Sequence, residues 1–101
     1  MSDSASLVCF DCRVALRLGF FWNVPEGPRY LFDRDGRPSS ASADRSRAVW
    51  RMFADHVYHE LRLVAEQSAD LGRMDRSRFL IIGGAEEGDP PIAEYVADWP
   101  G

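Results

Sequence analysis

The sequence predicts a small single α+β domain over residues 1–101, with an antiparallel sheet, a central helix and a short C-terminal helix. Apolar residues alternate with a period of two near the N-terminus, and they recur at helical spacing in the middle of the chain. A second apolar run, near residue 80, ends at two glycines. The hydrophobic fraction of 46% is typical of a folded protein. The sheet should therefore contain an N-terminal hairpin and later strands.

The N-terminal third predicts a hairpin. Residues 1–6 are polar, and we expect them to be disordered. From Val14 to Trp22 the apolar residues alternate, as in a half-buried strand. The turn formers of residues 23–28 follow, and then Tyr30 and Phe32 lie on one face of a second short strand. A strand, a turn and a returning strand make the predicted hairpin.

The middle of the chain predicts a capped helix followed by a strand. Residues 37–44 form a loop, in which Ser42 or Asp44 can accept a hydrogen bond from a free amide of the helix. The helix should end between residues 55 and 58, and a strand should begin near His59. One face of the helix is predicted to carry Val49, Met52, Phe53, His56 and Val57 toward the core.

The last third predicts two further elements. Residues 67–76 are read as a short helix or a loop, with Gly72 favouring a break. Residues 78–84 form a buried strand ended by two glycines. Residues 90–99 form the C-terminal helix, because proline is tolerated in a first turn. Its apolar face is predicted to hold Ile92, Tyr95 and Trp99.

Charge and composition indicate a bacterial cytoplasmic protein. All twelve basic residues are arginine, which suggests a GC-rich genome. Residues 1–51 carry eight Arg against six acids, and residues 52–101 carry four Arg against ten acids. The N-terminus lacks a secretory pattern, and no apolar run approaches the ~20 residues that a membrane span needs. We therefore expect reduced thiols and no membrane partner.

Two short motifs hold every cysteine and histidine in the chain. They are CFDC, with Cys9 and Cys12, and HVYH, with His56 and His59. Two residues between cysteines let a tight turn present both thiolates to one ion, and zinc favours four nitrogen or sulfur ligands in a tetrahedron. The two pairs complete that set. The sequence therefore predicts a structural zinc site at these four residues, which would stabilise a small core.

The predicted site is similar to a zinc ribbon or treble clef, in which a knuckle on a hairpin meets ligands from a later element. The similarity covers only the four ligands, and it identifies no family. The pairs are separated by 43 residues, and Arg13 stands where such knuckles often carry glycine.

Other readings of the four residues stay open. The cysteines could be reduced core thiols beside packed histidines. A redox dithiol is disfavoured, because a strand rather than a helix follows Cys12. A Cys–His hydrolytic pair would need Asp11 or Asp55 to orient an imidazole, and no oxyanion hole is evident. We predict no catalytic residues and no organic cofactor, and therefore no enzyme.

Size and acidity favour a protein-binding module. In both respects the chain looks like bacterial immunity proteins, which are inhibitors that neutralise a toxin by blocking a basic surface, and the aromatic anchors to test are Trp22, Tyr95 and Trp99. The alternative is a zinc-containing nucleic-acid-binding or regulatory adaptor. Its basic residues would be Arg13, Arg17, Arg29, Arg34 and Arg37, with Phe21 or Tyr30 stacking on bases. A pI of about 5.0 argues against nucleic acid. The sequence leaves the oligomeric state open.

Overall fold

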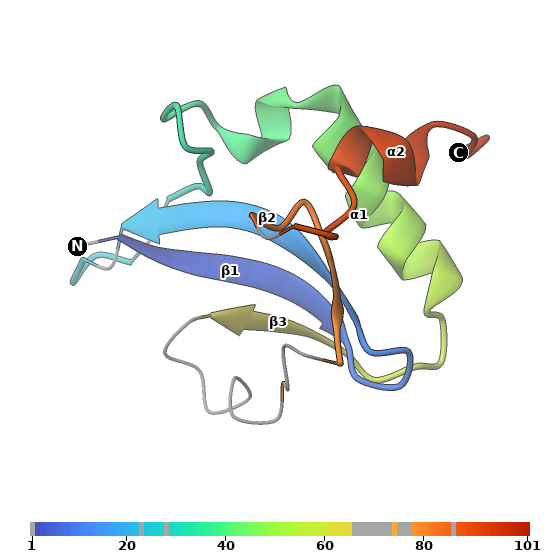
Figure 1. Cartoon of the computed structure of the whole chain (residues 1–101). Helices are drawn as coiled ribbons and strands as arrows, with labels where there is room; N and C mark the ends of the chain where they lie inside the picture. Colours follow the sequence, from blue (N-terminus) through green and yellow to red (C-terminus); the bar gives the residue numbers. More distant parts are fainter. Residues whose placement is uncertain (1, 23, 28, 66–73, 75–77, 86) are drawn as a thin grey trace.

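A computed structural model describes residues 2–22, 24–27, 29–65, 74, 78–85 and 87–101. The predicted α+β class is confirmed: one four-stranded sheet, in the order β3-β1-β2-β4, carries the helices over one face (Figure 1). The elements are β1 (Ser2–Cys9), β2 (Val14–Trp22), the 3-10 helix η1 (Ser39–Ala41), α1 (Ala43–Asp55), β3 (Leu61–Ala65), β4 (Leu80–Ile82) and α2 (Ile92–Val96).

The N-terminal hairpin uses different strands from those predicted. Residues 2–6 are not disordered, because they belong to β1, which pairs antiparallel with β2 through the turn at residues 10–13. The expected partner, the segment after residue 28, contributes a single bridge between Phe20 and Phe32. Polar residues fit in β1 because β2 pairs with the backbone along the whole strand, and β3 adds a second partner from Ala5 to Cys9.

The sheet is mostly antiparallel, with one exception. β3 pairs antiparallel with β1, but β4 runs parallel to β2. The predicted apolar strand near residue 80 is confirmed as β4, and Gly83 ends it with a φ of 76°. The strand expected from His59 begins two residues later, at Leu61, because residues 56–59 form a turn.

The predicted central helix is confirmed as α1. Ser42 caps it, with its hydroxyl oxygen accepting the backbone N–H of Arg45 at 3.1 Å. The helix ends at Asp55, within the predicted interval. The predicted core face is partly wrong, because Phe53 and Val57 are exposed while Ala48 and Met52 are buried.

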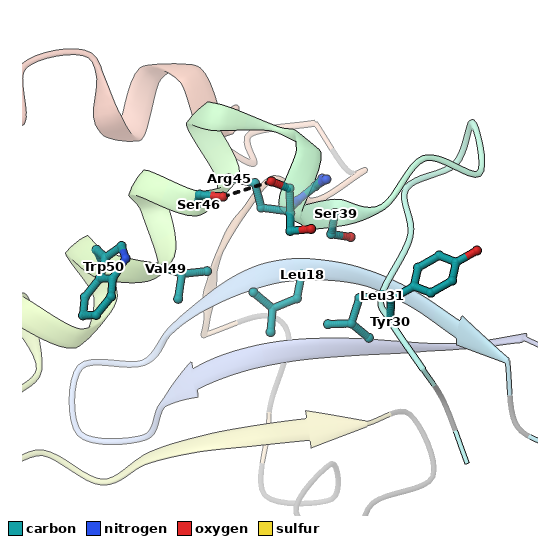
Figure 2. A pocket seen from close by; sticks show the side chains of 9 residues that line it. Leu18, Tyr30, Leu31, Ser39, Arg45, Ser46, Val49 and Trp50 are labelled. Atoms are coloured by element: carbon teal, nitrogen blue, oxygen red, sulfur yellow. Dashed lines mark hydrogen bonds between the residues drawn. The ribbon is translucent and has the colours of Figure 1, made fainter. Parts of the chain in front are cut away.

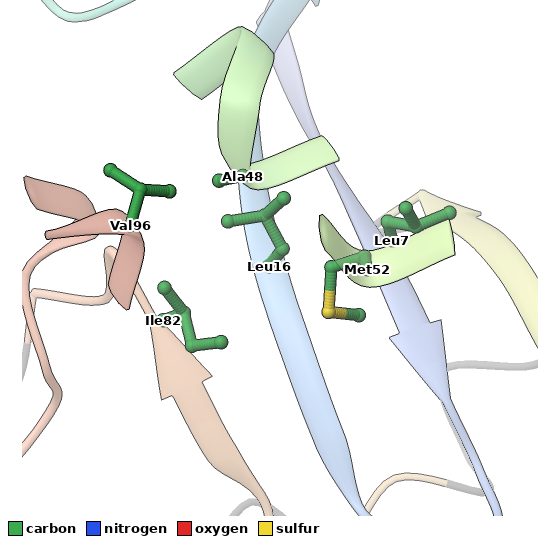
Figure 3. Close-up of a cluster of buried hydrophobic side chains, with 6 residues drawn as sticks. All are labelled: Leu7, Leu16, Ala48, Met52, Ile82 and Val96. Carbon is green, nitrogen blue, oxygen red and sulfur yellow. The ribbon is translucent and has the colours of Figure 1, made fainter. Parts of the chain in front are cut away.

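Both faces of the sheet bury apolar side chains. The face under the helices is shown in Figure 3, where strands and helices together bury Leu7, Leu16, Ala48, Met52, Ile82 and Val96. Consecutive strand residues point to opposite faces, so the other face buries Val8, Ala15, Val64 and Ile81. This second cluster explains why Ala15, which points away from Leu16, is as inaccessible as Leu16.

The C-terminal helix is shorter than predicted and packs on α1. α2 covers five residues, and Val96 is its buried side chain. The Arg51 guanidinium lies 4.5 Å from the centre of the Tyr95 ring, and Arg51 also donates to the carbonyl of Tyr95. Arg47 donates in the same way to the carbonyl of Trp99. These contacts hold the end of the chain against α1.

The helix or loop predicted for residues 67–76 lies outside the described residues, apart from residue 74. Within the described part of the chain, no helix has both the length and the apolar character that crossing a membrane requires.

Candidate metal centre

The cysteine pair sits on the turn of the β1–β2 hairpin. Cys9 is the last residue of β1, and Cys12 lies in the turn, where its backbone N–H donates to Sγ of Cys9 at 3.4 Å. Arg13 then adopts a left-handed φ of 57°. This is the conformation that glycine adopts at no steric cost, so it explains why knuckles of this kind often carry glycine there. The chain makes the same turn with arginine.

The histidine pair sits on the turn between α1 and β3. His56 is the C-cap residue of α1, and the backbone N–H of His59 donates to its carbonyl at 2.9 Å. Between them, Tyr58 has a φ of 73°, which reverses the chain. The turn therefore places the two imidazoles on the same side, with 5.6 Å between their ring centres.

Backbone hydrogen bonds connect the two turns. The N–H of Phe10 donates to the carbonyl of Glu60 at 3.0 Å, and the N–H of Glu60 donates to the Asp11 carboxylate at 2.6 Å. Sequence reasoning assigned Asp11 only as an orienting group for an imidazole. Its observed role is to fix the hairpin turn to the residue that follows His59. Its position inside the CFDC motif was the available signal.

All four predicted ligands meet at one point. Their ligand atoms lie within 4.8 Å of one another. Nδ1 of His59 is 3.3 Å from Sγ of Cys12, 3.7 Å from Sγ of Cys9 and 3.4 Å from Nδ1 of His56. In a tetrahedral zinc site, sulfur and nitrogen ligands are about 3.5 Å apart and two nitrogen ligands about 3.3 Å apart, given Zn–S and Zn–N bonds of about 2.3 and 2.0 Å. The three separations from His59 match this geometry.

The cluster is buried on one side and accessible on the other. Cys9 and His56 are buried, whereas Cys12 and His59 are exposed. The buried pair anchors the cluster to the hydrophobic core. The exposed pair leaves a path by which an ion can enter from solvent.

The pKa shifts of His56 and Cys12 bear on metal binding, because a metal ion binds the neutral imidazole and the thiolate. Burial lowers the pKa of His56; Asp55 opposes this shift and His59 adds to it. The neutral imidazole, which is the form that binds metals, is thereby favoured. Desolvation raises the pKa of Cys12, and the hydrogen bond to Cys9 and the charge of Cys9 raise it further. Metal binding would therefore displace a proton from this thiol.

The geometry weakens the catalytic readings of the same residues. Neither cysteine lies at a helix N-terminus, where the dipole would lower a thiol pKa for redox chemistry. The Asp11 carboxylate accepts from a backbone amide, and Asp55 accepts from Arg51 at 3.2 Å and from the Tyr95 hydroxyl at 3.5 Å. Among the described residues, these carboxylates therefore bond to other groups than the imidazoles.

The other residues singled out from the sequence do not join the cluster. Trp22 is exposed at the far end of β2, whereas Tyr95 and Trp99 are partly buried beneath Arg51 and Arg47. The arginines considered for nucleic acid spread over the hairpin turn, β2 and the loop before η1, at Arg13, Arg17, Arg29, Arg34 and Arg37.

No protein-family model, curated protein or solved structure matches this chain significantly.

Proposed function

We propose that Cys9, Cys12, His56 and His59 bind one structural zinc ion. The convergence of four ligand atoms within 4.8 Å, from two turns far apart in the sequence, is the observation that carries this proposal. Thiolate and imidazole together are the ligand set that zinc favours. Four protein ligands fill a tetrahedron and leave no position for a reacting water, so the proposed role is structural rather than enzymatic.

The ion would join the two halves of the fold. It would tie the β1–β2 turn to the C-terminal end of α1, where backbone hydrogen bonds already join the two turns. In zinc-finger peptides, binding at such sites contributes on the order of 10 kcal/mol. A contribution of this kind matters for a chain this short, whose core is necessarily small.

A comparison of variants tests the structural role. Cys9→Ser and His56→Ala should each lower the melting temperature by many degrees in the zinc-loaded protein, and a chelator should lower that of the wild type. Tyr58→Asn is the matched control, because Tyr58 lies fully exposed in the same turn, and asparagine tolerates its positive φ. The proposal fails if the ligand variants melt with the control and chelation has no effect.

We further propose that the domain is a cytoplasmic protein-binding module, of the kind that inhibits or neutralises a partner with a basic surface. An exposed apolar stripe on α1 and the turn after it supports this. Trp50 and Phe53 on α1 are 67% and 43% exposed, and Val57 in the following turn is 58% exposed. The Trp50 and Phe53 rings meet edge to face at 5.8 Å. Large exposed aromatics are typical anchors of protein interfaces.

The exposed stripe is a better candidate for the interface than Tyr95 and Trp99, which were expected from the sequence. Tyr95 and Trp99 already have partners within the fold, whereas Trp50 presents most of its surface to solvent. A pull-down from the native host should recover a partner with the wild type and lose it with Trp50→Ser. Glu26→Gln is the control, because Glu26 is exposed in the loop after β2 and lies outside the stripe. Equal recovery by all three proteins would remove this surface from the proposal.

A further inference from the structure

A cavity lies between α1, β2 and the segment before η1, and none of the four proposed metal ligands lines it. Its volume is about 440 Å³, within the range of small-molecule sites. Figure 2 shows aliphatic side chains of β2, α1 and the preceding segment along it, with polar side chains from η1 and the first turns of α1 on one wall. It is lined by Leu18, Tyr30, Leu31, Ser39, Ser40, Arg45, Ser46, Val49 and Trp50.

The cavity lining carries a single positive charge. Arg45 is the one residue in this lining that is charged at neutral pH, and no acid is among the nine. Within the described part of the chain, the Arg45 side chain has no ion pair and its Nε atom has no hydrogen-bond partner. A cation without a counter-ion beside an apolar wall is complementary to an anion attached to an apolar body.

A buried hydroxyl on the same wall also lacks a partner. Ser39 is 7% exposed, and its Oγ makes no hydrogen bond within the described residues. The residue fits there because Gly19 faces it: a Cβ at Gly19 would lie 2.4 Å from Oγ of Ser39. Its backbone N–H, in contrast, donates to the carbonyl of Leu31 at 2.7 Å. The backbone is satisfied and the hydroxyl is not, which is uncommon for a buried group.

We propose that this cavity binds a small amphiphilic monocarboxylate. The carboxylate would pair with the Arg45 guanidinium and accept a hydrogen bond from Ser39, while the apolar body would lie along Leu18, Leu31 and Val49 toward Trp50. One positive charge matches one negative charge, so a monoanion fits better than a phosphate dianion. The neighbouring cavity, which also touches Arg45, contains Asp33 and Asp35 besides Arg17 and Arg34, and so is less suited to an anion.

The first experiment compares two probes of equal chain length. Octanoate and 1-octanol are titrated into the zinc-loaded protein, and binding is followed by calorimetry and by tryptophan fluorescence. Octanoate should bind saturably and at least about tenfold more tightly than 1-octanol, because only octanoate carries the charge that Arg45 recognises. In Trp50→Phe the fluorescence change should disappear while the heat of binding remains.

The second experiment tests the two polar groups. Arg45→Gln should weaken octanoate binding about tenfold and leave 1-octanol unchanged, whereas Arg37→Gln, at an exposed position outside the cavity, should change neither. Ser39→Ala should weaken octanoate binding severalfold, yet it should raise the melting temperature of the ligand-free protein, because it removes an unsatisfied buried hydroxyl.

These results also define failure. The proposal is overturned if octanoate shows no saturable binding at millimolar concentration, if it binds no better than 1-octanol, or if Arg45→Gln and Arg37→Gln bind it equally. Failure of the zinc proposal would not by itself count against the cavity, because the cavity lining includes none of the four proposed metal ligands and the same titrations can be made with the folded protein as purified.

Discussion

Nδ1 of His59 lies 3.3 Å from Sγ of Cys12, although 46 residues separate them in the sequence. The same nitrogen is within 3.7 Å of the ligand atoms of Cys9 and His56. His59 is thus the proposed ligand that lies nearest to all three others. Because it is exposed, it can be removed with little disturbance of the hydrophobic core.

Replacing His59 should therefore separate metal binding from folding. His59→Ala should lower the affinity for zinc by at least about 100-fold, since loss of even an outer-shell partner costs 10- to 100-fold. In the metal-stripped protein it should change the free energy of unfolding by less than about 0.5 kcal/mol, as expected of a surface substitution. Competition with a chromophoric chelator measures the first quantity, and urea unfolding measures the second. Unchanged zinc affinity would exclude His59 as a ligand.

Asp11 should act on the site through the backbone. Asp11→Ala removes the acceptor for the N–H of Glu60, so we expect a loss of about 1 kcal/mol of stability and about tenfold weaker zinc binding. Asp11→Asn keeps an acceptor oxygen and should retain most of both. The same urea and chelator measurements apply. If the alanine variant matches the asparagine variant, the hydrogen bond between the two turns does not support the site.

Arg13 should gain stability when it is replaced by glycine. Its φ of 57° is costly for residues with a Cβ, so Arg13→Gly should raise the free energy of unfolding by up to about 1 kcal/mol. Arg17→Gly, within β2, should lower it by about 0.5 to 1 kcal/mol. Urea unfolding of the two variants beside the wild type tests this. A fall in stability for Arg13→Gly would show that the arginine side chain contributes more than its backbone conformation costs.

Tyr95 should make the free energy of unfolding fall as pH rises in the alkaline range. Its burial, mainly, and the nearby Asp55 raise its pKa to about 12, with Arg51 acting in the opposite direction. An unfolded tyrosine has a pKa of about 10. The contribution of Tyr95 is therefore fully present below pH ~10 and is lost as pH rises toward 12, because the unfolded state loses its proton first.

The comparison with Tyr95→Phe isolates this effect. The wild type should lose more stability than the variant between pH 10 and 12, and its absorbance titration should contain a late phenolate step, near pH 12, that the variant lacks. Parallel stability profiles for the two proteins would contradict the assignment.

Local patterns in the sequence were sufficient to predict α1. The cap at Ser42 and the helical spacing after it are properties of neighbouring residues, and the structure has both. The ligand set was also predictable, since the two cysteines and two histidines are the chain's entire supply. The meeting of the two turns could not be predicted from local patterns. It depends on long-range contacts such as the hydrogen bond from the N–H of Phe10 to the carbonyl of Glu60.

The parts that sequence reasoning missed depend on long-range pairing. The polar residues of β1 gave no alternation, and they form a strand because β2 pairs with them along its length. The parallel direction of β4 is set by the path of the chain rather than by its apolar run. Phe53 and Val57 fit a core-facing pattern, yet the buried face of α1 is rotated toward Ala48 and Met52, where the helix meets β2 and α2.

The zinc content of protein purified without a histidine tag tests the central claim most directly. Elemental analysis of the dialysed wild type should give one zinc per chain, and Cys9→Ser combined with His56→Ala should reduce it to a small fraction. Zinc well below one per chain in the wild type, after growth with added zinc, would contradict the account. So would a double variant that keeps its full zinc content.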